Sequence, residues 1–166
     1  NSSTINVSFT DKSLNNFFYL GWIKKIFPEA KFINCNRDPY IIMSSIIRNN
    51  LSNLSWAHQI DDITNYFNTY YEVLECWIKD SNINVYQMHY SKLVNNFDEE
   101  TQKIFKFCEL DWNDNLRNFY KMNFQSFTAS NIKIRKKLLN EEDKKHSMMS
   151  KFLKLQIDNV NWEEEY

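Results

Sequence analysis

The sequence predicts an α/β fold, in which a parallel sheet is flanked by helices within one domain over residues 1–166. Two short apolar runs, KFINCN at 31–36 and INVYQMHY at 83–90, have the length and composition of buried strands. Stretches with apolar residues at helical spacing surround both runs, and this alternation is typical of parallel sheets. No linker, repeat or low-complexity segment divides the chain, so we expect a single core.

Capping and breaking residues place the elements of the first half. Residues 1–10 alternate loosely between apolar and polar, which predicts a short strand. Helical spacing predicts a helix over 13–27, which Pro28 ends. Asp38 is a capping residue directly before a proline, so a second helix is expected over 39–50.

The second half is expected to be mostly helical around its one strand. The longest helical pattern spans 59–80 and has one broad apolar face. Acidic residues in the first turn favour a helix over 97–110. A short helix is expected over 113–121, followed by a polar stretch and a charged, helical tail.

The composition is that of a globular protein without a dominant charge. Hydrophobic residues make up 43% of the chain, and the net charge of −1 gives no general attraction to nucleic acid or anionic membranes. No apolar run approaches the ~20 residues of a membrane-spanning helix, and residues 1–20 lack a signal-peptide pattern. We therefore expect a soluble, cytoplasmic protein. Its histidines and cysteines are scattered without metal-ligand spacing, so no metal is expected.

The chain has a single glycine, Gly21, and it lies within a helical pattern. A glycine-rich loop that wraps phosphate groups with backbone N–H groups is therefore not expected within this sequence. Phosphate bound by this chain would be held by side chains and helix termini, or by a loop from outside the chain.

The strongest site signal is Arg37, which directly follows the first predicted strand. Ligands of open parallel sheets bind beyond the carboxyl ends of the strands. Helical spacing puts Ser45 and Arg48 on one face of the next helix. An arginine fork and a serine hydroxyl near a helix start suit a phosphate monoester. The alternative is that Arg37 pairs with Asp38 or another nearby acid and that Ser45 is ordinary helix surface.

Two more residues are expected near Arg37, at the carboxyl-end edge of the sheet. Tyr90 ends the second predicted strand, and Lys12 follows the expected first strand. Tyr90 can stack on a base or donate its hydroxyl to a phosphate, or it can be a core tyrosine. His89 is expected to point to the opposite face of its strand.

The later TASNIKIRKK stretch is either a flap that closes over an anion or a solvated basic face.

Four blocks in this order resemble the sulfotransferases: TDKSLNNFFYLGWIKKIFPEAKFINCNRDPYIIMSSIIRNN, YYEVLECW, VYQMHYSKLVNNFDEETQKIFKFCELDW and FTASNIKIRKK. The chain looks most like the bacterial branch related to the tyrosylprotein sulfotransferases, and the resemblance covers roughly residues 9–138. It implies a P-loop-NTPase-like fold. It also implies transfer of a sulfonyl group from 3′-phosphoadenosine 5′-phosphosulfate to a hydroxyl or amine, without a metal.

The resemblance assigns nucleotide-binding roles residue by residue. Arg37 and Ser45, eight positions apart, match the pair that binds the 3′-phosphate, and Arg48 shares their face. Tyr90 matches the tyrosine near the nucleotide. Lys136 falls where related sequences often carry a basic residue.

Two further residues match positions near the reacting group. Lys12 matches the lysine that stabilises the negative charge developing on the leaving phosphate. Ser130 matches the serine at the start of the late flap. One departure is small: Ser91 stands where the family usually has a glutamate.

The larger departure concerns the loop that holds the 5′-phosphosulfate in this family. That loop should lie well before Lys12, and only eleven residues precede Lys12. The chain is therefore expected to be a carboxy-terminal portion, truncated at its N-terminus and inactive alone, with the proton acceptor also upstream. A homodimer that covers the truncated edge is a further expectation.

Other function classes stay open at this point. A non-catalytic nucleotide-binding or scaffold domain with the same fold is the main alternative, and a kinase-like phosphotransferase is disfavoured because the glycine loop is absent. The sulfonyl acceptor is unknown, with carbohydrates, peptide tyrosines and small alcohols all open. Trp56 and His58, in a variable loop, either line an acceptor pocket or anchor local packing.

Overall fold

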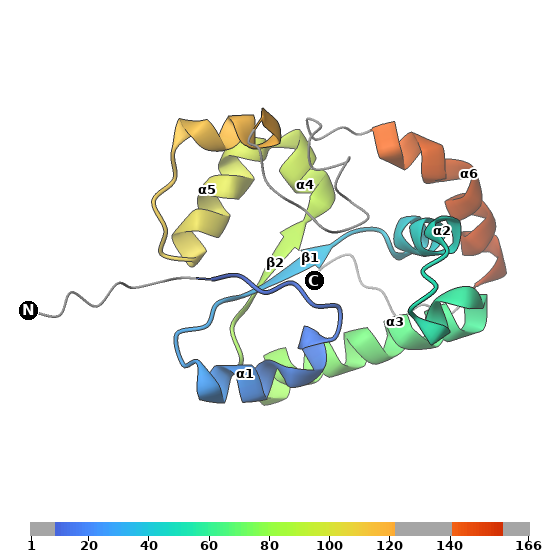
Figure 1. The fold of residues 1–166 in the computed structure, drawn as a ribbon, viewed down its shortest axis with the longest axis horizontal. Coiled ribbons are helices and arrows are strands. Elements are labelled where there is room, and N and C mark those ends of the chain that lie inside the picture. The colour runs from blue at the N-terminus through green and yellow to red at the C-terminus, as the bar shows by residue number, and fades with distance from the viewer. Residues whose placement is uncertain (1–8, 122–140, 158–166) are drawn as a thin grey trace, which may run out of the picture.

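A computed structural model of the protein describes residues 9–121 and 141–157. Two strands lie at the centre of the fold, with α1 and α3 on one side and α4 and α5 on the other (Figure 1). The elements of regular structure are α1 (Leu20–Ile26), β1 (Phe32–Asn36), α2 (Pro39–Asn49), α3 (Ile60–Glu75), β2 (Val85–His89), α4 (Tyr90–Asn95), α5 (Phe97–Phe107) and α6 (Glu141–Gln156). Shorter helical turns are η1 (Asn16–Tyr19), η2 (Ser55–His58), η3 (Cys76–Asp80) and η4 (Asp114–Lys121).

β1 and β2 form a parallel pair, so the α/β prediction with a parallel sheet is confirmed. The register pairs Phe32 with Val85 and Asn36 with His89, and the carboxyl ends of the two strands therefore lie side by side. Phe9 and Thr10, the last residues of the expected first strand, form no strand. The rest of that expected strand lies outside the described residues.

Most element boundaries follow the sequence signals. The helix α1 ends two residues before Pro28, and the long helix α3 continues as a π-helical turn, η3. The prediction that Tyr90 ends the second strand is wrong by one residue, because β2 ends at His89 and Tyr90 begins α4. The direction of the Tyr90 side chain is therefore set by the start of α4 and not by the alternation of side chains along β2.

The start of α2 matches its capping signal. The Asp38 side chain accepts a hydrogen bond from the backbone N–H of Ile41 at 3.0 Å, and Pro39 occupies the first turn. The helix ends at Asn50, whose φ of 42° is the left-handed conformation common at helix C-termini.

Replacing Asp38 with alanine is expected to lower the free energy of unfolding by about 1 kcal/mol, because the N–H of Ile41 loses its acceptor. Asp38→Asn keeps an acceptor oxygen and is expected to retain most of the stability. Urea denaturation followed by circular dichroism measures both variants. Equal losses in the two variants would show that the side chain contributes through its charge and not as a cap.

Two buried clusters make up most of the described core. The larger cluster joins α2, α3 and α6, and its buried members are Met43, Ile46, Ala57, Ile63, Phe67, Leu153 and Ile157. The smaller one joins α1 to α3 and consists of Leu20, Leu74 and Ile83. Within the first cluster, α6 packs on α2 through Leu153, which is fully buried. The predicted helical tail is thus confirmed and belongs to the core.

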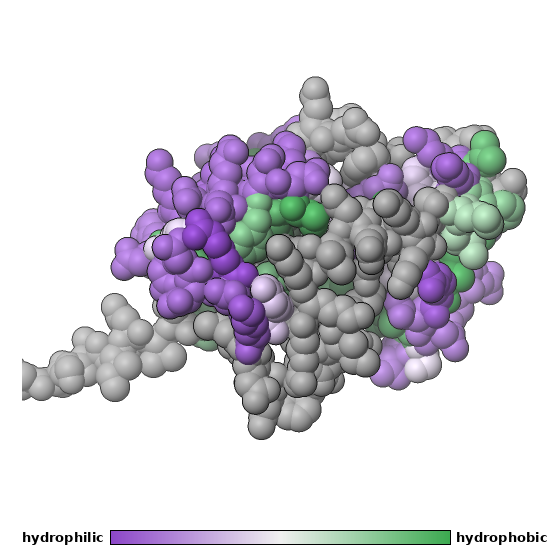
Figure 2. Space-filling view, turned by 90° about the horizontal axis from the view of Figure 1, so that it is seen from above, coloured by the Kyte–Doolittle hydropathy of each residue, from purple (hydrophilic) through white to green (hydrophobic). Residues whose placement is uncertain are grey.

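The outer surface differs between the two ends of the molecule. Figure 2 shows mostly hydrophilic residues over the α5 and η4 end, and apolar residues interspersed with hydrophilic ones at the α6 end. Met148, Phe152 and Leu155 are exposed on α6. Within residues 9–121 and 141–157, no helix is long and apolar enough to cross a membrane.

Candidate functional site

A cavity of about 130 Å³ lies at the carboxyl ends of the two strands. Asn36 and His89 are the last residues of β1 and β2 and are register partners. Arg37 follows β1 directly, and Tyr90 begins the helix after β2. The cavity is lined by Asn36, Arg37, Asp38, Ile41, His89, Tyr90 and Ser91. Its position is the one at which open parallel sheets bind their ligands.

Arg37 and Tyr90 are in contact within this cavity. The guanidinium carbon of Arg37 lies 4.6 Å from the centroid of the Tyr90 ring, which is a cation–π distance. Arg37 is half-buried, so water screens its charge less than it screens a fully exposed arginine. The neighbouring Asp38 side chain caps α2 through the N–H of Ile41. The arrangement holds one cation, oriented by an aromatic ring, beside the start of an eleven-residue helix.

Ser45 and Arg48 lie further along α2. Ile41 is the last α2 residue that lines the cavity, and Ser45 is four residues beyond it, about 6 Å along the helix axis on the same face. The Ser45 hydroxyl accepts a hydrogen bond from Nδ2 of Asn49 at 3.1 Å. Arg48 is exposed in the last turn of α2. A ligand group seated against Arg37 would extend along α2 to reach Ser45.

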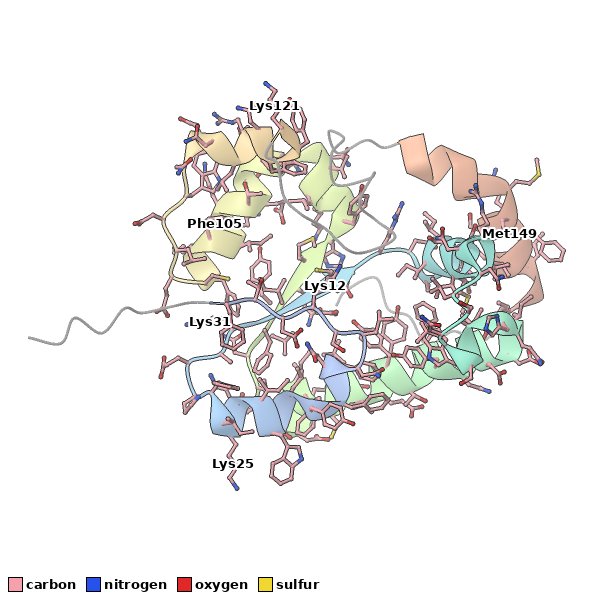
Figure 3. The ribbon with its side chains drawn as sticks, in the orientation of Figure 1. Lys12, Lys25, Lys31, Phe105, Lys121 and Met149 are labelled. Atoms are coloured by element: carbon pink, nitrogen blue, oxygen red, sulfur yellow. The ribbon has the colours of Figure 1, made fainter. Side chains whose placement is uncertain are left out.

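Lys12 does not line this cavity. It is exposed and lies beside the sheet (Figure 3). Desolvation raises the pKa of the Cys35 thiol, and the nearby positive charge of Lys12 acts in the opposite direction. The structure thus brings together Arg37 and Tyr90 but not Lys12.

The flap residues predicted from the sequence, Ser130 and Lys136, lie outside the described residues. The loop before α3 is described, and there Trp56 stacks on Tyr66 with ring centroids 3.8 Å apart and an interplanar angle of 6°. Trp56 therefore packs locally against α3. His58, on η2, is exposed.

Asn36 is a cavity residue that the sequence patterns did not single out, and His89 is one that they placed elsewhere. The prediction that His89 points to the opposite face is wrong, since it lines the cavity together with Tyr90. Burial lowers the pKa of His89, Lys92 lowers it further, and Glu100 acts in the opposite direction. At neutral pH the imidazole is therefore mostly neutral.

A side-chain amide network fixes Asn36 at the base of the cavity. Asn36 donates from Nδ2 to Oε1 of Gln87 at 2.9 Å, and Asn34 donates to the same oxygen at 2.8 Å. The Tyr70 hydroxyl donates to Oδ1 of Asn34, and burial raises the pKa of Tyr70 to about 12, so this donor stays protonated. The signal in the sequence was the recurrence of amides at alternate strand positions, which places them on one face.

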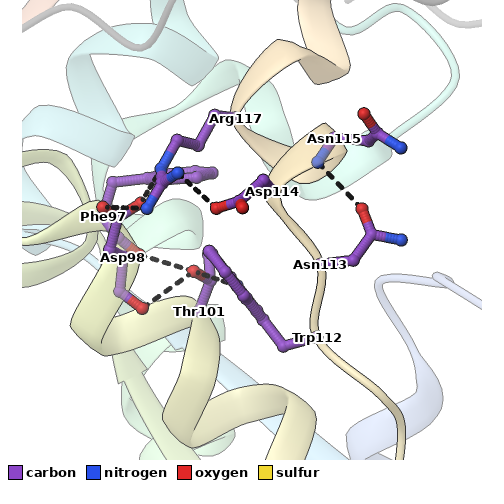
Figure 4. A network of polar contacts seen from close by, with 8 residues as sticks. All are labelled: Phe97, Asp98, Thr101, Trp112, Asn113, Asp114, Asn115 and Arg117. Carbon is purple, nitrogen blue, oxygen red and sulfur yellow. Dashed lines mark hydrogen bonds and ion pairs between the residues drawn. The ribbon is translucent and has the colours of Figure 1, made fainter.

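A larger cavity of about 680 Å³ lies between α4, α5 and η4, away from the strand ends. Its cation, Arg117, already pairs with Asp98 through two hydrogen bonds of 2.8 and 2.9 Å and also with Asp114 (Figure 4). Because two carboxylates neutralise this arginine, the larger cavity is poorly suited to an anion. The smaller cavity at the strand ends, which Arg37 and Tyr90 line, is therefore the candidate site considered further.

The size of the smaller cavity limits what it can hold. Sites for whole small molecules usually measure about 300 to 1,000 Å³. A cavity of about 130 Å³ fits one phosphate-sized group. Across residues 9–121 and 141–157, no three histidine, cysteine or acidic side chains are grouped so that they could hold a metal ion.

Comparison with known proteins identifies the family. Residues 3–114 match the model of the sulfotransferase family. An uncharacterized protein of Aquifex aeolicus (strain VF5) is 28% identical over 147 residues, which is 86% of this chain. The chain spans 19% of the length of that curated relative. The matched region contains β1, β2 and every described residue that lines the strand-end cavity. The chain therefore belongs to the sulfotransferase family.

Proposed function

We propose that this chain binds the 3′-phosphate end of 3′-phosphoadenosine 5′-phosphosulfate and contributes that half-site to sulfonyl transfer onto a hydroxyl or amine. The observation that supports the proposal most directly is the position of Arg37. It stands over Tyr90 at 4.6 Å, in a phosphate-sized cavity at the carboxyl end of β1. Membership of the sulfotransferase family supplies the class of ligand.

The chemistry of the cavity suits a phosphate monoester. Arg37 can donate two parallel hydrogen bonds to phosphate oxygens, and such charge-assisted bonds are about twice as strong as neutral ones. The N-terminus of α2 adds a partial positive charge from the helix dipole. Ser45 adds a hydroxyl one turn beyond Ile41, and Arg48 extends the same face. The Tyr90 ring both orients Arg37 and offers a surface near the nucleoside.

The roles near the reacting group rest on family resemblance. We propose that Lys12 stabilises the negative charge that develops on the leaving phosphate oxygen, because sulfonyl transfer, like phosphoryl transfer, passes through a loose transition state. Ser130 and Lys136 are proposed to contact the nucleotide from the late flap. The acceptor hydroxyl or amine is not assigned to any described pocket.

The 5′-phosphosulfate needs more residues than the cavity provides. Gly21 is not part of a phosphate loop, because it lies inside α1, where it packs closely against the Trp77 ring. We propose that the 5′ end of the nucleotide is bound by residues other than those described. Without them, the chain would act as a non-catalytic nucleotide-binding domain, which is the alternative function.

Isothermal titration calorimetry with adenosine 3′,5′-bisphosphate tests the half-site. Adenosine 5′-monophosphate, which lacks the 3′-phosphate, is expected to bind much more weakly. Arg37→Ala is expected to lower the affinity for the bisphosphate by roughly ten- to a hundredfold, equivalent to about 1.5 to 3 kcal/mol, because it removes a charge-assisted contact. Arg37→Lys keeps the charge but loses the fork, and we expect an intermediate affinity.

Lys25→Ala is the matched control, because it also removes one positive charge. Lys25 projects from α1 away from the sheet (Figure 3), where it lies 5.7 Å from the Trp22 ring. This variant is expected to bind the bisphosphate with unchanged affinity. If Arg37→Ala and Lys25→Ala weaken binding equally, the attraction is general electrostatics and the half-site proposal fails.

A further inference from the structure

His89 occupies a position in the strand-end cavity that the proposed function does not use. Its Cα is the register partner of that of Asn36, and its side chain lines the same cavity as Arg37 and Tyr90. The cavity is small, about 130 Å³, so a phosphate seated against Arg37 would also lie close to the imidazole. An imidazole nitrogen that carries a proton is a good donor to a phosphate oxygen.

The charges around His89 come from each element packed near it. Arg37 and Asp38 line the cavity from the β1–α2 junction, and Lys92 stands on α4. Glu100 on α5 attracts the protonated imidazole, but Lys103 contacts the Glu100 carboxylate at 2.7 Å and offsets part of its charge. Without an anion in the cavity, burial and Lys92 keep the imidazole mostly neutral.

We propose that His89 is a further phosphate-binding residue and that its imidazole takes up a proton from solvent when the 3′-phosphate enters the cavity. The inference rests on the proposed function, because the 3′-phosphate is the ligand. A phosphate dianion within a few ångströms favours the charged form of the imidazole. In the bound state Arg37 and His89 would together present two positive charges to the two negative charges of the phosphate.

The proposal predicts a pH dependence with a defined sign. The free imidazole has a pKa below its ordinary value, and the bound imidazole would have a higher one. Between these two pKa values, binding takes up a proton, so affinity rises as the pH falls. The phosphate itself stays a dianion above its second pKa of about 6. We expect the affinity for adenosine 3′,5′-bisphosphate to rise about threefold from pH 8 to pH 7. Uptake of one full proton over this range would raise the affinity about tenfold, and partial uptake raises it less.

Calorimetry in two buffers with different ionisation enthalpies counts the protons taken up. Titrations with the bisphosphate at pH 7.5 are expected to show net proton uptake in the unmodified protein. His89→Gln keeps hydrogen-bonding capacity but cannot be protonated, so its uptake should be lost. His58→Gln is the matched control, because His58 is exposed on η2 and does not line the cavity. Its proton uptake should equal that of the unmodified protein.

The outcomes separate this inference from the proposed function. Tight, Arg37-dependent binding with the same proton uptake in His89→Gln would overturn the role of His89 and leave the half-site intact. If the unmodified protein does not bind the bisphosphate, the half-site and the inference fail together. If His89→Gln does not fold, the imidazole is titrated by NMR in the unmodified protein, with His58→Gln aiding assignment. A His89 pKa that the bisphosphate does not raise would then overturn the inference.

Discussion

Leu153→Ala is expected to lower the free energy of unfolding by about 2 to 5 kcal/mol. Leu153 is fully buried and joins α6 to the cluster of Met43, Ile63 and Phe67. Truncation removes apolar contacts and leaves a cavity that the surrounding helices fill only in part. Because small domains are stable by about 5 to 15 kcal/mol, a loss of this size is a large fraction of the total. Urea denaturation monitored by circular dichroism gives the change.

Leu155→Ala provides a closely matched control, since it is the same substitution two residues away on the same helix. Leu155 is 78% exposed, and its truncation is expected to change the stability by less than about 0.5 kcal/mol. Comparable losses in both variants would show that burial against α2 does not determine the effect, because alanine has the higher helix propensity and propensity alone would predict no loss. A small loss in Leu153→Ala alone would mean that α6 contributes little to the core.

Gly21→Leu is expected to destabilise the protein by about 3 kcal/mol. A β-carbon at position 21 would lie 2.6 Å from Cζ3 of Trp77, which is far closer than atoms can approach. The Trp77 ring is not free to move aside, because its Nε1 donates a 2.7 Å hydrogen bond to the carbonyl oxygen of Phe17. Helix propensity alone predicts the opposite sign, a gain of about 0.7 kcal/mol for leucine over glycine. Thermal and urea denaturation therefore separate the two effects.

A double-mutant cycle with Trp77→Leu tests the cause. Trp77→Leu alone is destabilising, because it removes buried ring surface and the hydrogen bond to Phe17. In that background, the steric conflict at Gly21 disappears, and Gly21→Leu should become neutral or stabilising. An additive cycle, in which Gly21→Leu is equally damaging with and without Trp77, would rule out the close approach of α1 to Trp77 as the reason for the glycine.

The helices and strands of this fold could be predicted from sequence where a residue type occurs mainly in one structural role, such as helix capping. Asp38 followed by Pro39 marks a helix start with little ambiguity, and the structure confirms both the cap and the helix. The run over 31–36 is short, apolar and β-branched, and it forms β1 with a one-residue difference at its start. These signals depend on neighbours in the chain, so the sequence contains all the information that they need.

The composition of the cavity could be predicted only in part. Arg37 was identified because it follows a strand directly, and that relation is local. His89 was assigned to the wrong face, because the alternation of side chains along a strand does not show which face of the sheet lines the cavity. Lys12 was expected at the same edge of the sheet as Arg37, and it does not line the cavity. Both placements depend on the spatial relation between separate segments, which is not written in either segment alone.

The sequence by itself determined the α/β class, the two strands, the helix that Asp38 caps and the arginine at a strand end. Only the tertiary structure decided which residues share the cavity. The parallel register of β1 on β2 brings Asn36 beside His89 and lets the Arg37 guanidinium reach the Tyr90 ring. Register depends on packing against the covering helices and on the amide network across the strands, and these interactions join residues more than fifty positions apart.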